Sequence, residues 1–340
     1  MSAARPQLQR RARFELGDYP VDAAWSPDAG ALLVGGGEGK LHLIDTRAAS
    51  PAVQVLGEHA GGVLAVSWQG AGMLFASSAQ DGAVHLWDAR SRTARTILQS
   101  DDWTEHLAFA THGRLLAAAT GRQLHIFDAQ GTELAMLGSH AGAITGIAWK
   151  PKSSDIAAVG NGGARVHRVQ PELLSHDYPW KGACLTASWS PDGRVLAAGL
   201  QDGSVHFWKL AAGTQSEMKG YGSKVAHTSW SANSRQLATA ADELIVVWDF
   251  GGRGPEGSEP LQLRAHTGRI TQLRYAPQGA LLASGARDRR LLLWQPALAA
   301  EPVDADLLAD ELTLLRWSND GACLMAGDRS GAVTLYALTR

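Results

Sequence analysis

The tryptophans of this 340-residue chain recur at two fixed places of a repeat that is roughly 40 residues long, and ten of the twelve occupy those places. We expect the first place to end the first strand of each copy, where the chain has Trp25, Trp68, Phe109, Trp149, Trp189, Trp230, Tyr275 and Trp317. We expect the second place to end the third strand, where the chain has Ile44, Trp87, Phe127, Val169, Trp208, Trp248, Trp294 and Tyr336. A repeat of this length, with several short strands per copy, predicts a β-propeller in which each copy forms one sheet, or blade.

The copy around Trp68 shows the expected order of strands and turns. Alternating or apolar segments predict four strands, at residues 63–68, 73–77, 84–87 and 93–98. Asp81 and Gly82 form the dipeptide that is typical of a tight hairpin turn. The same order of the first three strands can be followed eight times along the chain.

The last copy ends at Tyr336, four residues before the sequence stops, which is too few for a fourth strand, whereas a strand-like segment, residues 11–16, precedes the first copy. We expect this segment to supply the missing outer strand of the last blade, which would close the ring without a covalent bond and remove exposed sheet edges. The prediction is an all-β, eight-bladed propeller of four-stranded antiparallel blades. Residues 11–340 are expected to form its single domain, and residues 1–10 a flexible segment.

Composition narrows the possible partners. A net charge of −2 argues against a general nucleic-acid or membrane surface. No apolar stretch is long enough to span a bilayer, and the basic N-terminus lacks the apolar core of a secretory signal. Cys184 and Cys323 lie in different copies, so neither a disulfide framework nor a metal site is expected. We expect a cytoplasmic protein.

Two copies carry His, Ser, Asp and Trp at an identical spacing of 18, 4 and 6 residues. The two sets are His59, Ser77, Asp81 and Trp87, and His266, Ser284, Asp288 and Trp294. On these motifs the chain resembles the WD-40 repeat family over residues 11–340. The resemblance implies that each set is a structural hydrogen-bonded tetrad, in which the histidine bridges Asp and Ser while Ser reaches the indole N–H. The other copies depart from the pattern, and His140, for example, has no Asp or Trp partner in its copy.

No pattern in the sequence points to catalysis. Five histidines share one place on the third strand of their copies: His42, His85, His125, His167 and His206. One residue per blade cannot converge on a single ion, so packing or surface roles are expected. The segment 35–40, GGGEGK, resembles a phosphate-binding loop, but Val34 and Leu41 stand where that motif needs Gly and Ser or Thr, so we expect a turn. We therefore predict no catalytic residue, metal or cofactor.

Five aromatic residues fall outside the repeat places, and we expect all of them in the loops that enter a blade's first strand: Tyr19, Trp103, Tyr178, Trp180 and Tyr221. The resemblance implies that these loops share one rim with the Asp-bearing turns, and that this rim is the usual partner-binding face. Exposed Tyr and Trp are the residue types that anchor interfaces. Trp180 and Tyr221 occupy the place that His59 has in its copy, so packing in the space of an absent tetrad is the alternative for them. Tyr19 and Trp103 are off that place and are the better candidates for exposure.

Charge on the expected rim is uneven. Cations gather in the later copies, at Lys181, Lys224, Arg269, Arg287 and Arg329. Acids gather in the early copies, at Asp18, Asp101, Asp102 and Glu105. A face with two signs of charge orients a protein partner, although ordinary solvated charge is the alternative.

These observations favour a non-catalytic scaffold that binds a protein or peptide on the rim. The rival is a small-ligand binder or cofactor-dependent enzyme that uses the central channel, for which Asp22, His106 and His227 are the few candidates on innermost strands. A third possibility, a reader of modified peptides with an aromatic cage, is not singled out by any spacing. Partner identity is open, as is the choice between a monomer and a subunit of a hetero-complex.

Overall fold

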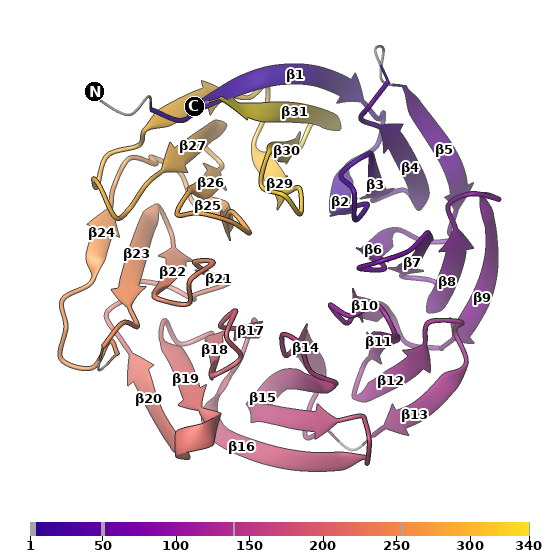
Figure 1. The fold of residues 1–340 in the computed structure, drawn as a ribbon, viewed down its shortest axis with the longest axis horizontal. Coiled ribbons are helices and arrows are strands. Elements are labelled where there is room, and N and C mark those ends of the chain that lie inside the picture. The colour runs from indigo at the N-terminus through magenta and orange to yellow at the C-terminus, as the bar shows by residue number, and fades with distance from the viewer. Residues whose placement is uncertain (1–4, 49–51, 139, 253, 340) are drawn as a thin grey trace. The chain divides into compact units, whose positions relative to one another are not determined.

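The computed structural model describes residues 5–48, 52–138, 140–252 and 254–339. The described residues form antiparallel strands with one short 3₁₀ helix, Leu210–Ala212. The strands assemble into eight sheets (Figure 1). The predicted fold class, an all-β propeller of eight blades, is confirmed. No helix among these residues is long and apolar enough to cross a membrane.

The chain divides into two compact units, the first of which is residues 21–189. Its sheets follow chain order, so that neighbouring strands are joined by short turns. Its strands are β2 (Pro20–Trp25), β3 (Ala31–Gly36), β4 (Lys40–Asp45) and β5 (Val53–Glu58); β6 (Val63–Trp68), β7 (Leu74–Ala79), β8 (Ala83–Asp88) and β9 (Thr93–Gln99); β10 (Thr104–Phe109), β11 (Leu115–Thr120), β12 (Gln123–Asp128) and β13 (Glu133–Leu137); β14 (Ile144–Trp149), β15 (Asp155–Arg168) and β16 (Leu174–Ala183); and β17 (Ser188–Trp189).

The second unit contains residues 1–20 and 190–340. Its last sheet departs from chain order, because its outer strand comes from the beginning of the chain. The strands of the second unit are β18 (Val195–Gly199), β19 (Val205–Lys209) and β20 (Thr214–Met218); β21 (His227–Trp230), β22 (Gln236–Ala241), β23 (Leu244–Asp249) and β24 (Leu261–Leu263); β25 (Ile270–Tyr275), β26 (Leu282–Ala286), β27 (Arg290–Trp294) and β28 (Asp304–Leu307); and β29 (Leu312–Trp317), β30 (Cys323–Asp328), β31 (Ala332–Thr339) and β1 (Gln7–Glu15).

The eight aromatic residues at the first repeat place all end a first strand and are all buried, as predicted. Several of them bond to the blade before. Trp149 Nε1 donates to the carbonyl oxygen of Ala108 at 2.8 Å, and Trp317 Nε1 donates to that of Arg274 at 3.0 Å. A large apolar ring with one N–H donor therefore both fills the space between sheets and ties their inner strands together.

Small residues on the second strands let the sheets approach closely, as their composition predicts. A Cβ added to Gly285 would lie 2.3 Å from a methyl carbon of Leu312, on the next blade's first strand. A Cβ added to Gly35 would lie 2.5 Å from a methyl carbon of Val63. Both distances are shorter than van der Waals contact, so close packing at these places excludes any side chain.

One blade differs from the four-stranded pattern because its second and third strands are a single long element. β15 turns back on itself at Gly162 and Gly163, whose φ angles of 97° and 116° suit glycine. The backbone N–H of Val169 donates to the carbonyl oxygen of Ser154 at 3.1 Å and so joins the two ends. β15 thus fills two of the four predicted strand positions, and this sheet has three strands, β14-β15-β16.

The N-terminal strand completes the last blade, as predicted. β1 runs antiparallel to β31, from Gln7 opposite Thr339 to Glu15 opposite Ala332. The strand is longer than the expected segment 11–16. The predicted flexible segment 1–10 is therefore wrong for residues 7–10, and residues 1–4 lie outside the described part. The side chains on the outer face of this strand are polar, and polar sequences of this kind are typical of disordered segments.

Polar contacts fix β1 at its other edge as well. The Arg10 guanidinium donates to the Asp306 carboxylate at 2.5 and 2.6 Å, and Tyr336 Oη donates to the same carboxylate at 2.7 Å. The backbone N–H of Leu8 donates to Asp304 at 2.6 Å. β1 is thus tied to β28 of the neighbouring blade as well as to β31.

We predict that Phe14→Ala destabilises the protein, because Phe14 is the buried residue of β1 and lies opposite Val333. Truncating a buried aromatic ring in a packed site costs about 3–5 kcal/mol. The urea midpoint measured by tryptophan fluorescence should fall clearly. The matched control is Arg13→Ala on the exposed face, where loss of a solvent-exposed ion pair costs about 1 kcal/mol or less. Equal midpoints for the two variants would show that β1 contributes little to the fold.

Candidate functional site

Both predicted tetrads form complete hydrogen-bond chains. In the first, Trp87 Nε1 donates to Ser77 Oγ at 2.9 Å, Ser77 donates to His59 Nε2 at 2.8 Å, and His59 Nδ1 donates to Asp81 at 3.2 Å. The second set, headed by His266, has the corresponding distances of 2.8, 2.8 and 3.0 Å. Burial lowers the pKa of His59, so the ring is neutral at neutral pH and can donate to Asp81 while accepting from Ser77.

A third, altered tetrad explains Tyr221. Trp248 Nε1 donates to Tyr221 Oη at 2.6 Å, and Tyr221 Oη bonds to Thr239 Oγ1 at 2.6 Å. Tyr221 precedes Thr239 by 18 residues, which is the spacing from His59 to Ser77. Burial raises the pKa of Tyr221 to about 12, so the hydroxyl stays protonated. The packing alternative is therefore correct, and Tyr221 is removed from the candidate binding residues.

We predict that Tyr221→Phe lowers stability by about 1–3 kcal/mol, because the buried indole N–H of Trp248 loses its acceptor and Thr239 Oγ1 keeps only its bond to the carbonyl oxygen of Val246. Thermal unfolding followed by circular dichroism measures the change. Tyr19→Phe is the matched control, since that side chain is 44% exposed. The structural role would be refuted if the two variants melted at the same temperature.

Tyr178 and Trp180 do not lie in a blade-entry loop, which corrects the prediction for both. They belong to β16, where Tyr178 is opposite Ala164. Both are half-buried; the Tyr178 ring packs 4.7 Å from that of His176, and the Lys181 ammonium lies 6.0 Å from the Trp180 ring. Proline has no N–H donor and is tolerated in a strand only where no donor is needed, as at an edge. Pro179 therefore argued against a strand in the sequence.

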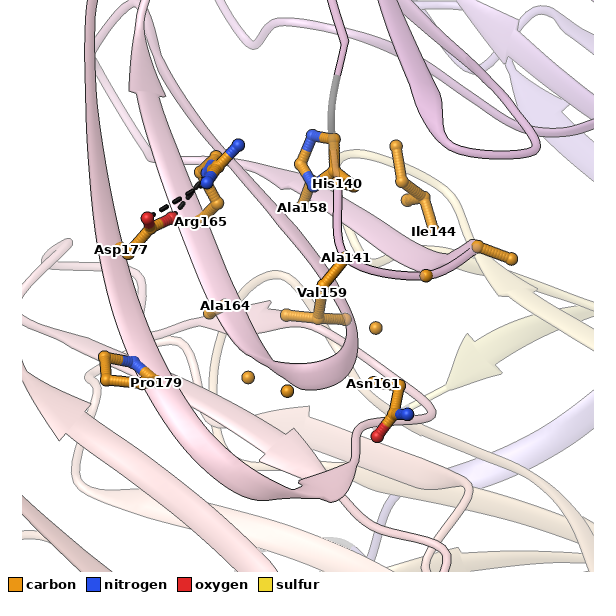
Figure 2. A pocket seen from close by; sticks show the side chains of 15 residues that line it. His140, Ala141, Ile144, Ala158, Val159, Asn161, Ala164, Arg165, Asp177 and Pro179 are labelled. Atoms are coloured by element: carbon orange, nitrogen blue, oxygen red, sulfur yellow. Dashed lines mark hydrogen bonds and ion pairs between the residues drawn. The ribbon is translucent and has the colours of Figure 1, made fainter.

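The same blade has a pocket where its tetrad is missing. The pocket has a volume of about 220 Å³ and is lined by the Gly162–Gly163 turn, which replaces the Asp-bearing turn of other blades. Figure 2 shows Arg165 directed at Asp177, while His140 and Asn161 lie farther along the wall. His140 and His167 bring their Nε2 atoms within 3.3 Å of each other. The charged groups of this pocket thus already pair with each other.

The third-strand histidines contact residues of their own blades, in keeping with the expected packing roles. His125 Nδ1 lies 2.8 Å from Glu133, His167 Nδ1 lies 2.7 Å from Ser175 Oγ, and His206 Nε2 lies 3.2 Å from Gln215. The His85 ring stacks on His59 with centroids 4.4 Å apart. Within the described ranges, no three His, Cys, Asp or Glu side chains are grouped so that they could hold a metal ion.

Tyr19 and Trp103 lie in blade-entry loops and are exposed. Tyr19 lies between β1 and β2 and is 44% exposed, while Trp103 lies between β9 and β10 and is 51% exposed. Trp103 lines a pocket of about 360 Å³ together with three exposed acids, Asp101, Asp102 and Glu105. These loops therefore present aromatic surface that the protein itself does not cover.

The four predicted cations of the second unit are all exposed, and they lie in its loops: Lys224, Arg269, Arg287 and Arg329. Arg287 Nε and Arg329 Nη1 lie 3.8 and 3.9 Å from one carboxylate oxygen of Glu311. The backbone N–H of Arg287 donates to the carbonyl oxygen of Arg269, which joins the tight turn to the entry loop of the same blade. Glu311 was not among the predicted residues, because only the fold brings it between two arginines.

Two histidines with lowered pKa values give the protein a predicted pH dependence. Burial is the main cause that lowers the pKa of His167 and of His227 to about 4, from an ordinary value of 6.5. Between these pH values the unfolded chain binds more protons than the folded one, so the free energy of unfolding falls as the pH falls through this window. At about pH 5 we expect a loss on the order of 1–2 kcal/mol for each histidine.

Urea unfolding at a series of pH values measures this loss. The double variant His167→Gln and His227→Gln should show a shallower fall between about pH 7 and pH 5. A slope identical to that of the unchanged protein would contradict the assignment.

The sheets and the hydrogen-bonded tetrads define the class of the protein, a β-propeller in which two of the repeats carry a complete tetrad. Four segments match the family described as WD domain, G-beta repeat: residues 51–88, 173–209, 214–249 and 257–295. These are the copies in which tryptophan occupies the second repeat place. The chain therefore carries WD-40 repeats, and the resemblance inferred from the tetrads is confirmed.

Among the relatives, the B-type cell cycle switch protein ccs52A of Medicago truncatula is 26% identical over 247 residues, which are 68% of this chain and 50% of the relative. Protein FIZZY-RELATED 2 of Arabidopsis thaliana is 26% identical over 261 residues, which are 72% and 52% of the two chains. Cell division cycle 20.1, cofactor of APC complex, also of Arabidopsis thaliana, is 23% identical over 266 residues, or 77% and 42%. The chain spans about half the length of the curated relatives it matches.

Proposed function

We propose that this protein is a non-catalytic scaffold that binds a protein or peptide partner through its blade-entry loops, with residues 11–340 acting as one domain. The observation that carries the proposal is the contrast between two sets of aromatic residues. The eight that end first strands are buried, whereas Tyr19 and Trp103 are 44% and 51% exposed on loops. Large aromatic side chains held outside the core are typical anchors of protein interfaces.

The relatives support a binding role. One of them is named as a cofactor of a protein complex and another as a cell cycle switch protein. We propose by analogy that this chain also acts by binding other proteins, and that it does so in the cytoplasm. Cys184 and Cys323 belong to different repeats and form no disulfide with each other, which fits a reducing compartment.

The candidates for a channel-based enzyme have structural roles that support the scaffold over its rival. The Asp22 carboxylate accepts hydrogen bonds from the backbone N–H groups of Ala23 and Val66, both at 2.9 Å. Burial lowers the pKa of His106 and of His227. The Asp22 carboxylate is already bonded to backbone N–H groups, and burial keeps the imidazole rings of His106 and His227 neutral. Both observations suit side chains that support the inner strands.

The test is to capture partners from the native cell with the unchanged protein and with Tyr19→Ala and Trp103→Ala. We expect partner recovery to fall by about tenfold or more when an aromatic anchor is lost, while the melting temperature changes little. Leu298→Ala is the matched control, since that side chain is 74% exposed in the connection to β28. Undiminished recovery with both aromatic variants would remove this site assignment, and a large loss of stability would place the two rings in the core.

A further inference from the structure

The exposed cations of the second unit form one connected surface on loops of three successive blades. Lys224 lies just before β21, Arg269 directly precedes β25, and Arg287 and Arg329 directly follow β26 and β30. Within each of the last two blades a backbone hydrogen bond of 2.9 Å joins the tight turn to the entry loop, from Arg287 to Arg269 and from Arg329 to Glu311. The cations are therefore carried on loops whose backbones are fixed. We call these four residues the basic surface.

The basic surface has more positive than negative charge. Glu311 is shared by Arg287 and Arg329 at 3.8 and 3.9 Å, beyond hydrogen-bond distance, so one carboxylate faces two guanidinium groups. Across residues 5–339, gaps aside, no ion pair engages Lys224 or Arg269. Asp288, the nearest acid in sequence to Arg287, is already bonded to His266 and to the backbone N–H of Thr267. Acids also lie on these loops, at Asp242, Glu243 and Asp310, so the excess of cations is local to the four side chains of the basic surface and does not extend to the whole of these loops.

The positive field reaches the inner strand. After burial, the charges of Arg274, Arg269 and Lys224 are the causes that lower the pKa of His227, each acting in the same direction. These side chains therefore lie close enough to one another to act on a common point. An anion that approaches these loops meets their summed potential, which is stronger than that of a single arginine.

An aromatic side chain adjoins the basic surface. The backbone N–H of Leu16 donates to the carbonyl oxygen of Gly331, in the turn that carries Arg329. A Cβ added to Gly331 would lie 2.8 Å from the carbonyl oxygen of Asp18, the residue before Tyr19. The exposed ring of Tyr19 thus follows directly on a segment packed against the Arg329 turn.

We propose that the basic surface binds an acidic segment of the partner protein, rich in Asp or Glu, with Tyr19 as an apolar contact at its edge. This proposal rests on the proposed scaffold function and names the chemistry of its partner. Guanidinium groups bind carboxylates in paired hydrogen bonds, and cations spread over three blades suit several carboxylates along an extended chain better than one compact anion. The net charge of −2 disfavours nucleic acid as the occupant.

The probe is a fluorescein-labelled hexaglutamate peptide, with binding measured by anisotropy at low and at physiological salt. The unchanged protein should bind it, more weakly at higher salt, and should not bind a hexalysine peptide. Arg287→Ala with Arg329→Ala should weaken binding by about fivefold or more. Glu311→Gln should strengthen it, because the carboxylate that pairs with both arginines is neutralised. Arg264→Ala, an exposed arginine bonded to Gln262, is the matched control and should leave binding unchanged.

The proposal is overturned if the double arginine variant binds hexaglutamate as well as the unchanged protein, or if Glu311→Gln weakens binding. It is also overturned if a single-stranded DNA oligonucleotide binds more tightly than hexaglutamate at physiological salt. Failure here is distinct from failure of the scaffold. If Tyr19→Ala still abolishes partner capture while hexaglutamate does not bind, the partner is held by other chemistry and the scaffold function stands.

Discussion

The hydrogen bond from an inner-strand tryptophan to the backbone of the preceding blade is the contact on which the rest of the structure depends. Trp189 repeats it, donating to the carbonyl oxygen of Ala148 at 3.0 Å, and the side-chain oxygens of Ser67 and Ser229 accept from the next blade's backbone at the same level. Each bond fixes the distance and rotation of one sheet against its neighbour while the ring excludes water. Loops can then vary in sequence without moving the strands that carry them.

This contact also explains how far the sequence could predict the fold. The space between blades is filled by a large flat ring, so Phe109 and Tyr275 still mark the strand ends where tryptophan is absent. The tetrads were predictable through the resemblance to the WD-40 repeat family, which assigns these four residues at this spacing to one hydrogen-bonded set. For Tyr221 the sequence left exposure and packing open, and the hydrogen bonds of the fold decide for packing. Prediction failed where Pro179 interrupted a strand pattern that the backbone nevertheless follows. It also failed for residues 7–10, whose polar side chains face solvent from a regular strand.

The candidate binding residues were only partly predictable for a different reason. Exposure of Tyr19 and Trp103 followed from their being out of register with the repeat. The relation of Arg287 and Arg329 to Glu311 could not be predicted from the sequence. The three residues are 18 to 42 positions apart and meet only through backbone bonds between turns and entry loops. Charge counts therefore identified the region, while the fold decides which charges compensate one another.

The pairing of β1 with β31 has a consequence for biosynthesis. The ribosome makes β1 before its partner β31, with more than 300 residues between them. Until β31 has been made, β1 has no sheet to join and the last blade is incomplete. Pairing between strands so far apart in the sequence forms slowly, and aggregation-prone strand edges stay exposed until it has formed. Until that pairing forms, β1 and the edge of β31 that it covers both present unpaired backbone N–H and C=O groups.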